Sequence, residues 1–281
     1  MTLIAVPNVS DGADAIRFVH PIEAAGARVL DVHADPVHNR SVITATAPST
    51  VLVDAMADLA VAALVIDLTR HSGVHPRLGG LDVCPIVPHG EPMSSAVEVA
   101  RATGRHIADR AGLPVYLYGK ATQRPETEAL PDLRRGGLAG LIERCEQGLM
   151  PDLGPRRIDP RRGVVCVGAR DVLIAFNVWI AGDVRAAAAV AAEVRSPDVR
   201  ALGLEMREGL AQVSMNLTAP HRMGIEQAFA SVAESCERLG GEVTATEIVG
   251  LVPERLLPRP ETQAARLLMQ PGRSLESALS G

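Results

Sequence analysis

The chain has 281 residues, of which 47% are apolar, and a formal net charge of −5. This length suffices for one large domain or two of ordinary size, and the apolar fraction is that of a globular protein with a proper core, which excludes a disordered chain. Lys and Arg are spread along the sequence without forming a basic stripe, so we expect no nucleic-acid partner.

Cysteine spacing and hydropathy indicate in which cellular compartment the protein is expected. The four cysteines stand far apart, without CxxC or CxxH spacing, and we expect reduced, buried thiols in a cytoplasmic protein. The N-terminus has no positively charged leader. The longest apolar region, residues 51–68, contains Asp54, Asp58 and Asp67, which makes it too charged to span a bilayer. We therefore expect neither export nor membrane insertion.

Hydrophobic periodicity predicts alternating strands and helices in the first half of the chain. The expected strands are residues 3–7, 28–32, 40–47, 81–87 and 115–118, and the expected helices are residues 12–25, 50–65 and 94–111. Residues 120–163 are rich in Arg, Pro and Gly around one expected helix, 138–147. This segment is interpreted as a connector or as a lid over a site.

The second half begins again with a pair of strands and continues in a β-α-β-β-α-β order. Its expected strands are residues 164–167, 172–180, 199–206, 210–217 and 242–252, and its expected helices are 183–194 and 221–239. The first half has a similar order with an extra helix and strand. We therefore predict an α/β (α+β) fold of two ferredoxin-like lobes, with mixed β-sheets packed together, helices outside and a ligand cleft between the lobes.

The expected domain boundaries follow from this element order. Residues 1–163 form the N-terminal lobe and contain the catalytic loop, and residues 164–257 form the C-terminal lobe. Residues 258–281 are polar, interrupted by Pro and only weakly periodic. We expect them to form a loosely attached tail with a helix around residues 262–269.

The densest polar segment beside a strand contains the candidate catalytic residues. Arg70, His71, His75, Arg77 and Asp82 fall within thirteen positions, among glycines and prolines that fix the shape of a loop. A histidine exchanges protons near neutral pH, and arginines bind carboxylates, so residues 70–85 are the candidate catalytic segment. By composition alone either histidine is a candidate, and a structural loop is the alternative.

Two further clusters have open interpretations. His33, His38, His71 and His75 would supply metal ligands, but none of their spacings falls on a convincing helix or strand face, and we expect no metal. Residues 151–163 contain four arginines and would suit an anionic ligand, with a solvated connector as the alternative. No Gly-rich phosphate-binding fingerprint occurs.

Eight segments match a known family in the order in which they occur. They are VPNVSDG, NRSV, DLTRHSGVHPRLGGLDVCPIVP, PVYLYG, PDLGP, VGARDVLIAFNV, LAQVSMNL and IVGLVP. On these motifs the chain resembles the glutamate formiminotransferase family, the transferase portion of formiminotransferase-cyclodeaminase, over about residues 3–257. The chain stops before a cyclodeaminase domain, so we expect a stand-alone transferase.

The resemblance implies transfer of a formimino group from N-formimino-L-glutamate to N5 of tetrahydrofolate, a co-substrate, without a metal and in a homodimer. The family's catalytic histidine belongs to the HPR triplet, which makes His75 the general acid and base. Its folate-contacting loop corresponds to residues 154–163. The expected cofactor-binding residues are Gly154, Pro155, Arg156 and Gly163, and the expected substrate-binding residues are Asn39, Arg40, Arg77, Asp82 and His33.

Four positions depart from the family pattern. Val74 replaces an acidic residue before the HPR triplet, and His33 replaces the second Asp of a DVDAG motif. Val9 replaces an aromatic residue, and Asp171 replaces a Lys. Two alternatives follow: a paralogue that transfers a formyl or formimino group to or from a different amine, or a catalytically inactive folate-binding protein. A third alternative is a metal-dependent amidohydrolase that uses the four histidines of the polar clusters.

Overall fold

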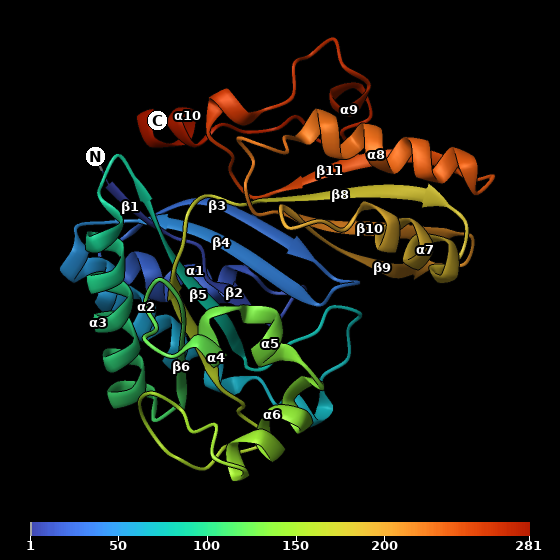
Figure 1. The fold of residues 1–281 in the computed structure, drawn as a ribbon. Helices are drawn as coiled ribbons and strands as arrows, with labels where there is room; N and C mark the ends of the chain where they lie inside the picture. The colour runs from blue at the N-terminus through green and yellow to red at the C-terminus, as the bar shows by residue number, and fades with distance from the viewer. Residues whose placement is uncertain (1) are drawn as a thin grey trace. The chain divides into compact units, whose positions relative to one another are not determined.

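A computed structural model describes residues 2–281. The chain divides into two compact units, Met1–Asp171 and Val172–Gly281, and each contains one β-sheet with helices packed against it (Figure 1). The expected two-lobe α+β architecture is therefore confirmed. Every helix within the described range is too short or too polar to cross a membrane.

The first unit is built on a seven-stranded mixed sheet. Its strands are β1 (Thr2–Ala5), β2 (Asn8–Val9), β3 (Arg28–Asp35), β4 (Arg40–Thr46), β5 (Leu81–His89), β6 (Val115–Gly119) and β7 (Val165–Ala169). Both β1 and β2 pair with β4 on one side and β5 on the other, so together they fill one position in the sheet. The strands β3, β4, β1 with β2, and β5 form an antiparallel ferredoxin-like core, and β7 and β6 extend it in parallel beyond β5.

Helices cover both faces of this sheet. One face packs against α1 (Ile16–Ala24), α2 (Ser49–Ala62) and α3 (Met93–Ala111) through the larger apolar core. In α2 the fully buried residues Leu52, Met56 and Leu59 recur at helical spacing and form its sheet-facing stripe.

The opposite face packs against a smaller cluster that includes Tyr116 and Cys166, because successive side chains of a strand point to opposite faces. Three short helices follow β6: α4 (Pro125–Glu128), α5 (Leu130–Arg134) and α6 (Gly137–Glu146), where the sequence predicted one helix in a connector. Of these, α5 and α6 contribute residues to the smaller cluster.

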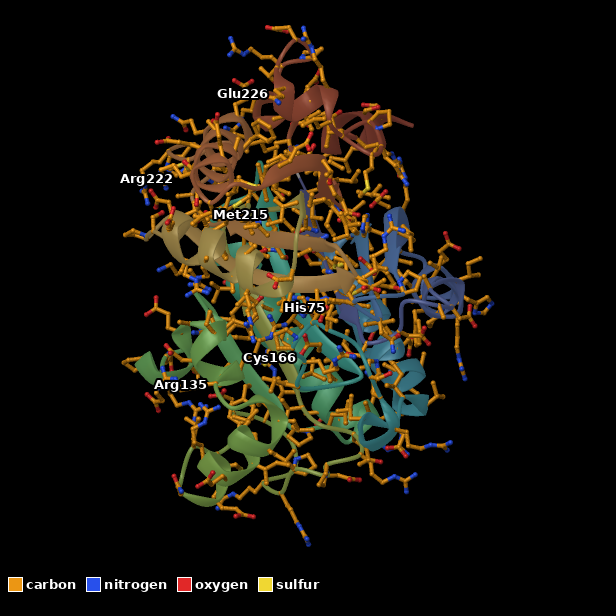
Figure 2. All side chains as sticks on the ribbon, turned by 90° about the vertical axis from the view of Figure 1, so that its right-hand side faces the viewer. His75, Arg135, Cys166, Met215, Arg222 and Glu226 are labelled. Carbon is orange, nitrogen blue, oxygen red and sulfur yellow. The ribbon has the colours of Figure 1, made fainter. Side chains whose placement is uncertain are left out.

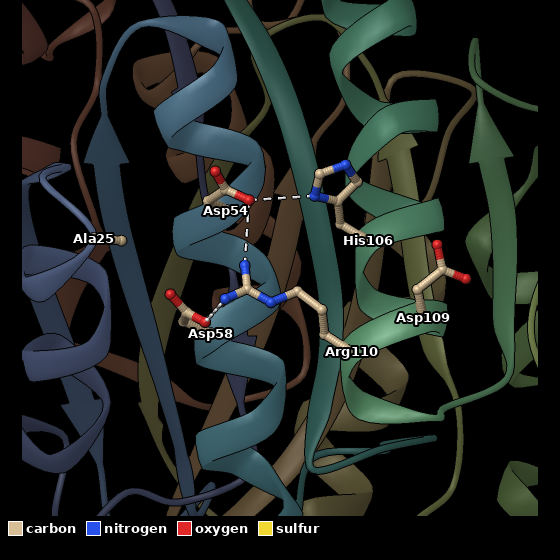
Figure 3. Close-up of a pocket in the computed structure, with 6 residues that line it drawn as sticks. All are labelled: Ala25, Asp54, Asp58, His106, Asp109 and Arg110. Carbon is tan, nitrogen blue, oxygen red and sulfur yellow. Dashed lines mark hydrogen bonds and ion pairs between the residues drawn. The ribbon is translucent and has the colours of Figure 1, made fainter.

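Ion pairs join the exposed sides of α2 and α3, as Figure 3 shows. Asp54 lies 3.3 Å from Nδ1 of His106 and 3.2 Å from Nη1 of Arg110, and Nη2 of Arg110 lies 2.6 Å from Asp58. All four side chains are at least one-third exposed, so solvent screens these pairs and they add little to stability.

The second unit is a four-stranded antiparallel sheet in the order β11-β8-β10-β9. Its strands are β8 (Ile174–Ala181), β9 (Val199–Arg207), β10 (Leu210–Leu217) and β11 (Glu242–Val249), and its two long helices are α7 (Val184–Val194) and α8 (Ile225–Arg238). The chain passes through them as β8-α7-β9-β10-α8-β11, which is the predicted order with ferredoxin-like strand positions. Phe176 and Val178 of β8 are fully buried in the core beneath the helices.

The boundary between the units differs from the expected one. Residues 164–167 were expected to pair with residues 172–180, but β7 lies parallel to β5 and β6 in the first sheet. The first unit therefore extends to Asp171. The reason is that β7 completes the α-helical crossover from β6 through the connector, whereas the apolar pattern of a strand does not specify its partner.

The expectation of a loosely attached tail was wrong. The tail contains α9 (Gln263–Arg266) and α10 (Leu275–Ser280), and its Ala264 and Leu275 are buried. The Thr246 amide donates to the carbonyl of Leu267 at 2.8 Å, and the Thr246 side chain donates to Ala264 at the same distance. Backbone hydrogen bonds, which periodicity does not report, thus hold the tail on the second unit.

The contrast between the α2 core stripe and the surface ion pairs gives a stability prediction. Leu59→Ala should lower the free energy of unfolding by about 2–5 kcal/mol, because it leaves a cavity in a closed core. Arg110→Met, on the neighbouring helix, should cost less than about 1 kcal/mol. Urea unfolding of both variants measures the difference; similar losses would contradict the assignment of the ion pairs as weak.

Candidate active site

The candidate catalytic segment forms an irregular loop between α2 and β5. Asp67 caps a short 3-10 helix, Leu68–Arg70, by accepting hydrogen bonds from the amide and hydroxyl of Thr69. The Leu68 amide donates to the carbonyl of Arg161 at 2.9 Å, and an Arg161 guanidinium nitrogen lies 3.0 Å from the Asp67 carboxylate. The catalytic segment therefore lies directly beside residues 154–163, which contain four arginines and are called the Arg-rich loop below.

Two glycines fasten the ends of the Arg-rich loop. Gly154 and Gly163 have φ of 79° and 70°, in the left-handed region that favours glycine. A Cβ on Gly163 would lie 2.0 Å from the carbonyl oxygen of Leu78, and one on Gly154 would lie 2.4 Å from that of Leu113. Between them Pro155 and Arg156 are exposed, so the loop presents basic side chains from fixed ends.

His75 lies half-buried in the catalytic segment, where Figure 2 labels it. Its Nδ1 is 2.8 Å from the carbonyl oxygen of Pro76, and Nη1 of Arg40 lies 2.5 Å from Nδ1 and 3.0 Å from Nε2. A carbonyl oxygen can only accept and a guanidinium can only donate. We therefore assign the imidazole hydrogen to Nδ1, toward Pro76, and the lone pair to Nε2, which accepts from Nη1 of Arg40; the ring is then neutral.

The charges around His75 act in the same direction. Burial, followed by the positive charges of Arg40 and Arg134, holds the pKa of His75 well below its usual value of 6.5. His38 stacks beside it at a tilt, with ring centroids 5.8 Å apart, and adds to the lowering. An imidazole with these neighbours is unprotonated at neutral pH, the state required of a general base.

Arg40 begins β4 and links His75 to the sheet. Its Nε donates to Oδ1 of Asn8 at 2.9 Å, its Nη2 bonds the same oxygen, and its Nη1 lies 3.9 Å from Oδ2 of Asp82. Burial and the neighbouring Arg134 lower the pKa of Arg40 to about 9, so it remains a cation at neutral pH.

Asp82 is the buried carboxylate of the site, with a side chain only 2% exposed. Its Oδ1 accepts the Leu78 amide at 2.7 Å, and its Oδ2 accepts Nη2 of Arg134 at 2.5 Å. Arg134 lies at the end of α5, in the segment interpreted as a connector, and sequence reasoning missed it. No local pattern signals this contact, because 52 positions separate the two residues.

Arg77 and Asn39, which are predicted to bind substrate or to shape the site, both hydrogen-bond to the loop. Arg77 donates to the carbonyl oxygens of His75 and His38 and to Nδ1 of His71. Asn39 adopts a positive φ of 49°, accepts the Gly12 amide at 3.0 Å and donates to the Ser72 carbonyl at 2.7 Å. These bonds brace the segment that carries His75.

The remaining histidines occupy separate positions. Nε2 of His71 lies 2.8 Å from the Ser10 carbonyl oxygen, which can only accept, so the ring hydrogen is on Nε2. The lone pair of Nδ1 then accepts a hydrogen bond from Arg77. His33 lies on β3 opposite Val42, on the same face of the sheet as Arg40. No three His, Cys, Asp or Glu side chains in residues 2–281 are grouped to hold a metal ion.

The departures from the family pattern fall in different environments. Val74 is 40% exposed, and Asp171 is also exposed, so both side chains reach solvent. Val9 is fully buried in the core of the first unit, where a smaller side chain packs in place of an aromatic one. The four cysteines are free and buried, as predicted.

Fold and site together define an α/β protein with a ferredoxin-like unit that presents a neutral histidine between arginines. Comparison with known proteins supplies the family. Residues 2–170 match the N-terminal subdomain of the formiminotransferase domain, and residues 172–270 match the formiminotransferase domain. The chain belongs to the formiminotransferase family and is a transferase of one-carbon groups, as the sequence motifs predicted.

Three relatives illustrate the similarity. A glutamate formimidoyltransferase of Thermoplasma acidophilum is 36% identical over 92% of this chain and 90% of its own length. One from Streptococcus pyogenes serotype M1 is 33% identical over 90% of this chain and 89% of its own length. The formimidoyltransferase-cyclodeaminase of Sus scrofa is 36% identical over 90% of this chain, which spans 50% of that longer protein.

The low pKa of His75 predicts how stability varies with pH. Between that pKa and the value of about 6.5 in the unfolded chain, the unfolded state binds more protons. The free energy of unfolding should therefore fall as the pH falls below about 6.5. His75→Gln should flatten this slope in urea unfolding, and NMR should show the His75 ring neutral at pH 6.5. A ring half-protonated at that pH would contradict the assignment.

Proposed function

We propose that this protein transfers a formimino group from N-formimino-L-glutamate to N5 of tetrahydrofolate, with His75 as general acid and base. The observation that carries the proposal is the neutral imidazole of His75, whose Nε2 lone pair is held by Arg40 in a chain of the formiminotransferase family. The names of its relatives, glutamate formimidoyltransferase and formimidoyltransferase-cyclodeaminase, support the donor and the reaction.

The proposed reaction exchanges one carbon–nitrogen bond for another. A bond forms between N5 of tetrahydrofolate and the formimino carbon, and the bond between that carbon and the glutamate nitrogen breaks. When Nη1 of Arg40 turns from Nε2 of His75 to the substrate, Nε2 accepts the proton that N5 loses and returns it to the departing amine. Nδ1 keeps its hydrogen on the Pro76 carbonyl throughout, so the ring changes charge without turning. No net proton or electron is consumed.

The Arg-rich loop is proposed to bind the folate. Arg156 and its neighbours Arg157 and Arg162 are exposed, and the loop that carries them is fixed beside the catalytic segment by Gly163 and Arg161. The carboxylates of folate are suitable partners for such guanidinium groups. Gly154 and Gly163 would then contribute through the loop's shape, and Pro155 and Arg156 by contact.

We also propose that the enzyme works as a cytoplasmic homodimer, as the resemblance implies. Two other functions are tested by the same assay. A paralogue would turn over a different formyl- or formimino-amine with tetrahydrofolate, and an inactive folate-binding protein would bind tetrahydrofolate without turnover. Metal analysis of the purified protein tests the amidohydrolase alternative, which requires a stoichiometric metal ion.

Replacement of His75 tests the proposed chemistry. His75→Gln should lower kcat by about 10²–10⁴-fold, because the proton shuttle is lost, while tetrahydrofolate binds with nearly unchanged affinity. The absorbance change on incubation with tetrahydrofolate and formiminoglutamate measures turnover. His106→Gln, on the exposed side of α3, is the matched control and should retain full activity. Full turnover by His75→Gln would remove the histidine from the mechanism.

Replacement of Arg156 tests the proposed folate loop. Arg156→Ala should raise KM for tetrahydrofolate by roughly 3–10-fold and leave kcat within twofold, because an exposed charge-assisted contact contributes about 1 kcal/mol. Arg105→Ala, a change at another exposed arginine, on α3, serves as the control. Equal KM values in the two variants would argue against contact between Arg156 and folate.

A further inference from the structure

Positive charge exceeds negative charge around His75. Oδ2 of Asp82 lies 3.9 Å from Nη1 of Arg40 and 2.5 Å from Nη2 of Arg134. The negative charge of the same carboxylate also stabilises the charged form of Arg77. The carboxylate of Asp35 is occupied elsewhere, since it accepts two amides of its own turn and lies 3.8 Å from Nε2 of His38. One buried carboxylate thus faces three guanidinium groups.

Tyr118 does not supply the missing negative charge. Its ring lies over Gly168, where an added Cβ would be 2.5 Å from a ring carbon. Its hydroxyl is close enough to Arg40 and Arg134 to interact with their charges. Burial raises the pKa of Tyr118 to about 12, so it is protonated at neutral pH. The site therefore retains an excess of positive charge, which is costly in a partly buried place.

Several N–H donors of the Arg134 guanidinium have no acceptor among the described residues. Its side chain is 17% exposed, yet within residues 2–281 only its Nη2 donates a hydrogen bond, to Asp82. Its Nε is buried and has no hydrogen-bond partner. A guanidinium offers five N–H donors in a planar fork, and leaving them unsatisfied near the interior costs free energy. The partly exposed Arg40, at 15%, lies beside it.

We propose that Arg134 and Arg40 form a carboxylate-binding subsite beside His75, which holds the α-carboxylate of the one-carbon donor. This rests on the proposed function, because it concerns the same site. An incoming carboxylate would supply both the missing negative charge and an acceptor for the fork of Arg134. Arg134 is then a substrate-binding residue supplied by α5, a role that Arg77 and Asn39 cannot easily fill while they brace the loop.

The chemistry of the two substrates favours the donor over folate. In an N-formimino amino acid the reacting nitrogen is bonded to the carbon that carries the α-carboxylate, so that carboxylate lies next to the reacting centre. The carboxylates of tetrahydrofolate stand at the far end of the molecule from N5. Because Nη1 of Arg40 is 3.0 Å from Nε2 of His75, a group bound to these arginines is close to the proton shuttle.

Binding of the donor carboxylate at this subsite would also raise the proton affinity of the His75 imidazole. The groups that face His75 are Arg40, Arg134 and His38, which disfavour its protonation, and the Asp82 carboxylate beyond the two arginines. A bound carboxylate neutralises part of this positive charge, so the imidazole gains proton affinity only when the donor is present. The acid limb of kcat should therefore lie at higher pH than that of kcat/KM.

The test pairs two protein variants with two unreactive ligands. Arg134→Met removes the charge at similar length, and Arg135→Met, the next residue, is the control because its side chain is 75% exposed and paired only with Asp132. The ligands are N-acetyl-L-glutamate and the same molecule with its α-carboxylate converted to an amide. Calorimetry without tetrahydrofolate gives the affinities.

The native protein and Arg135→Met should bind the acid at least tenfold more tightly than the amide, and Arg134→Met should lose this preference. Arg134→Lys, which keeps the charge, should recover part of it. In Arg134→Met the gap between the acid limbs of kcat and kcat/KM should narrow, which a merely structural brace would not cause. Equal preference in Arg134→Met and the native protein would overturn the proposal, as would equal losses for acid, amide and tetrahydrofolate.

These outcomes are separate from those of the proposed function. Binding of the two ligands requires no turnover, so an acid preference that depends on Arg134 would stand even if formimino transfer were not observed. Conversely, active transfer with an unchanged KM for formiminoglutamate in Arg134→Met would leave the proposed function intact and remove the subsite.

Discussion

The carboxylate of Asp82 organises the candidate active-site region of the first unit. It lies in β5, almost completely shielded from solvent, and each of its oxygens accepts a hydrogen bond. One oxygen accepts the Leu78 amide and fixes the end of the catalytic segment, and the other accepts Arg134 and approaches Arg40. Because a buried charge must be compensated, this one side chain draws arginines from β4 and α5 to the loop that carries His75.

The comparison of the two units shows which segment carries Arg134. Both contain the ferredoxin-like core, and helices pack against the sheet of each. Only the first unit extends its sheet with β7 and β6 and inserts three short helices in the connection between them. That insertion carries Arg134, so the added segment contributes the partner of the buried Asp82 carboxylate and not merely the length of the connection.

Much of this could be predicted from the sequence, for physical reasons. Period-two and period-3.6 patterns are local, and they predicted nearly every long strand and helix. The HPR triplet pointed to His75 because its family pattern lies within a few consecutive residues, and the role of His75 stays a prediction. The partner of β7, the attachment of the tail and the ion pair of Arg134 with Asp82 depend on contacts between distant residues, which a local pattern cannot report. Arg77 and Asn39 stay predicted site residues, and their hydrogen bonds show in addition that they brace the loop.

The close approach of Gly163 to the carbonyl of Leu78 has a consequence for how this enzyme can diversify. The amide of Val164 also donates to that carbonyl, so the end of the Arg-rich loop and the catalytic segment are joined at Leu78, in a contact called the seam below. Neither segment can gain or lose a residue near the seam without displacing the other. New substrate preferences should therefore arise by exchange of side chains along the exposed middle of the Arg-rich loop, around Arg156, while the backbone that sets the position of His75 is inherited unchanged.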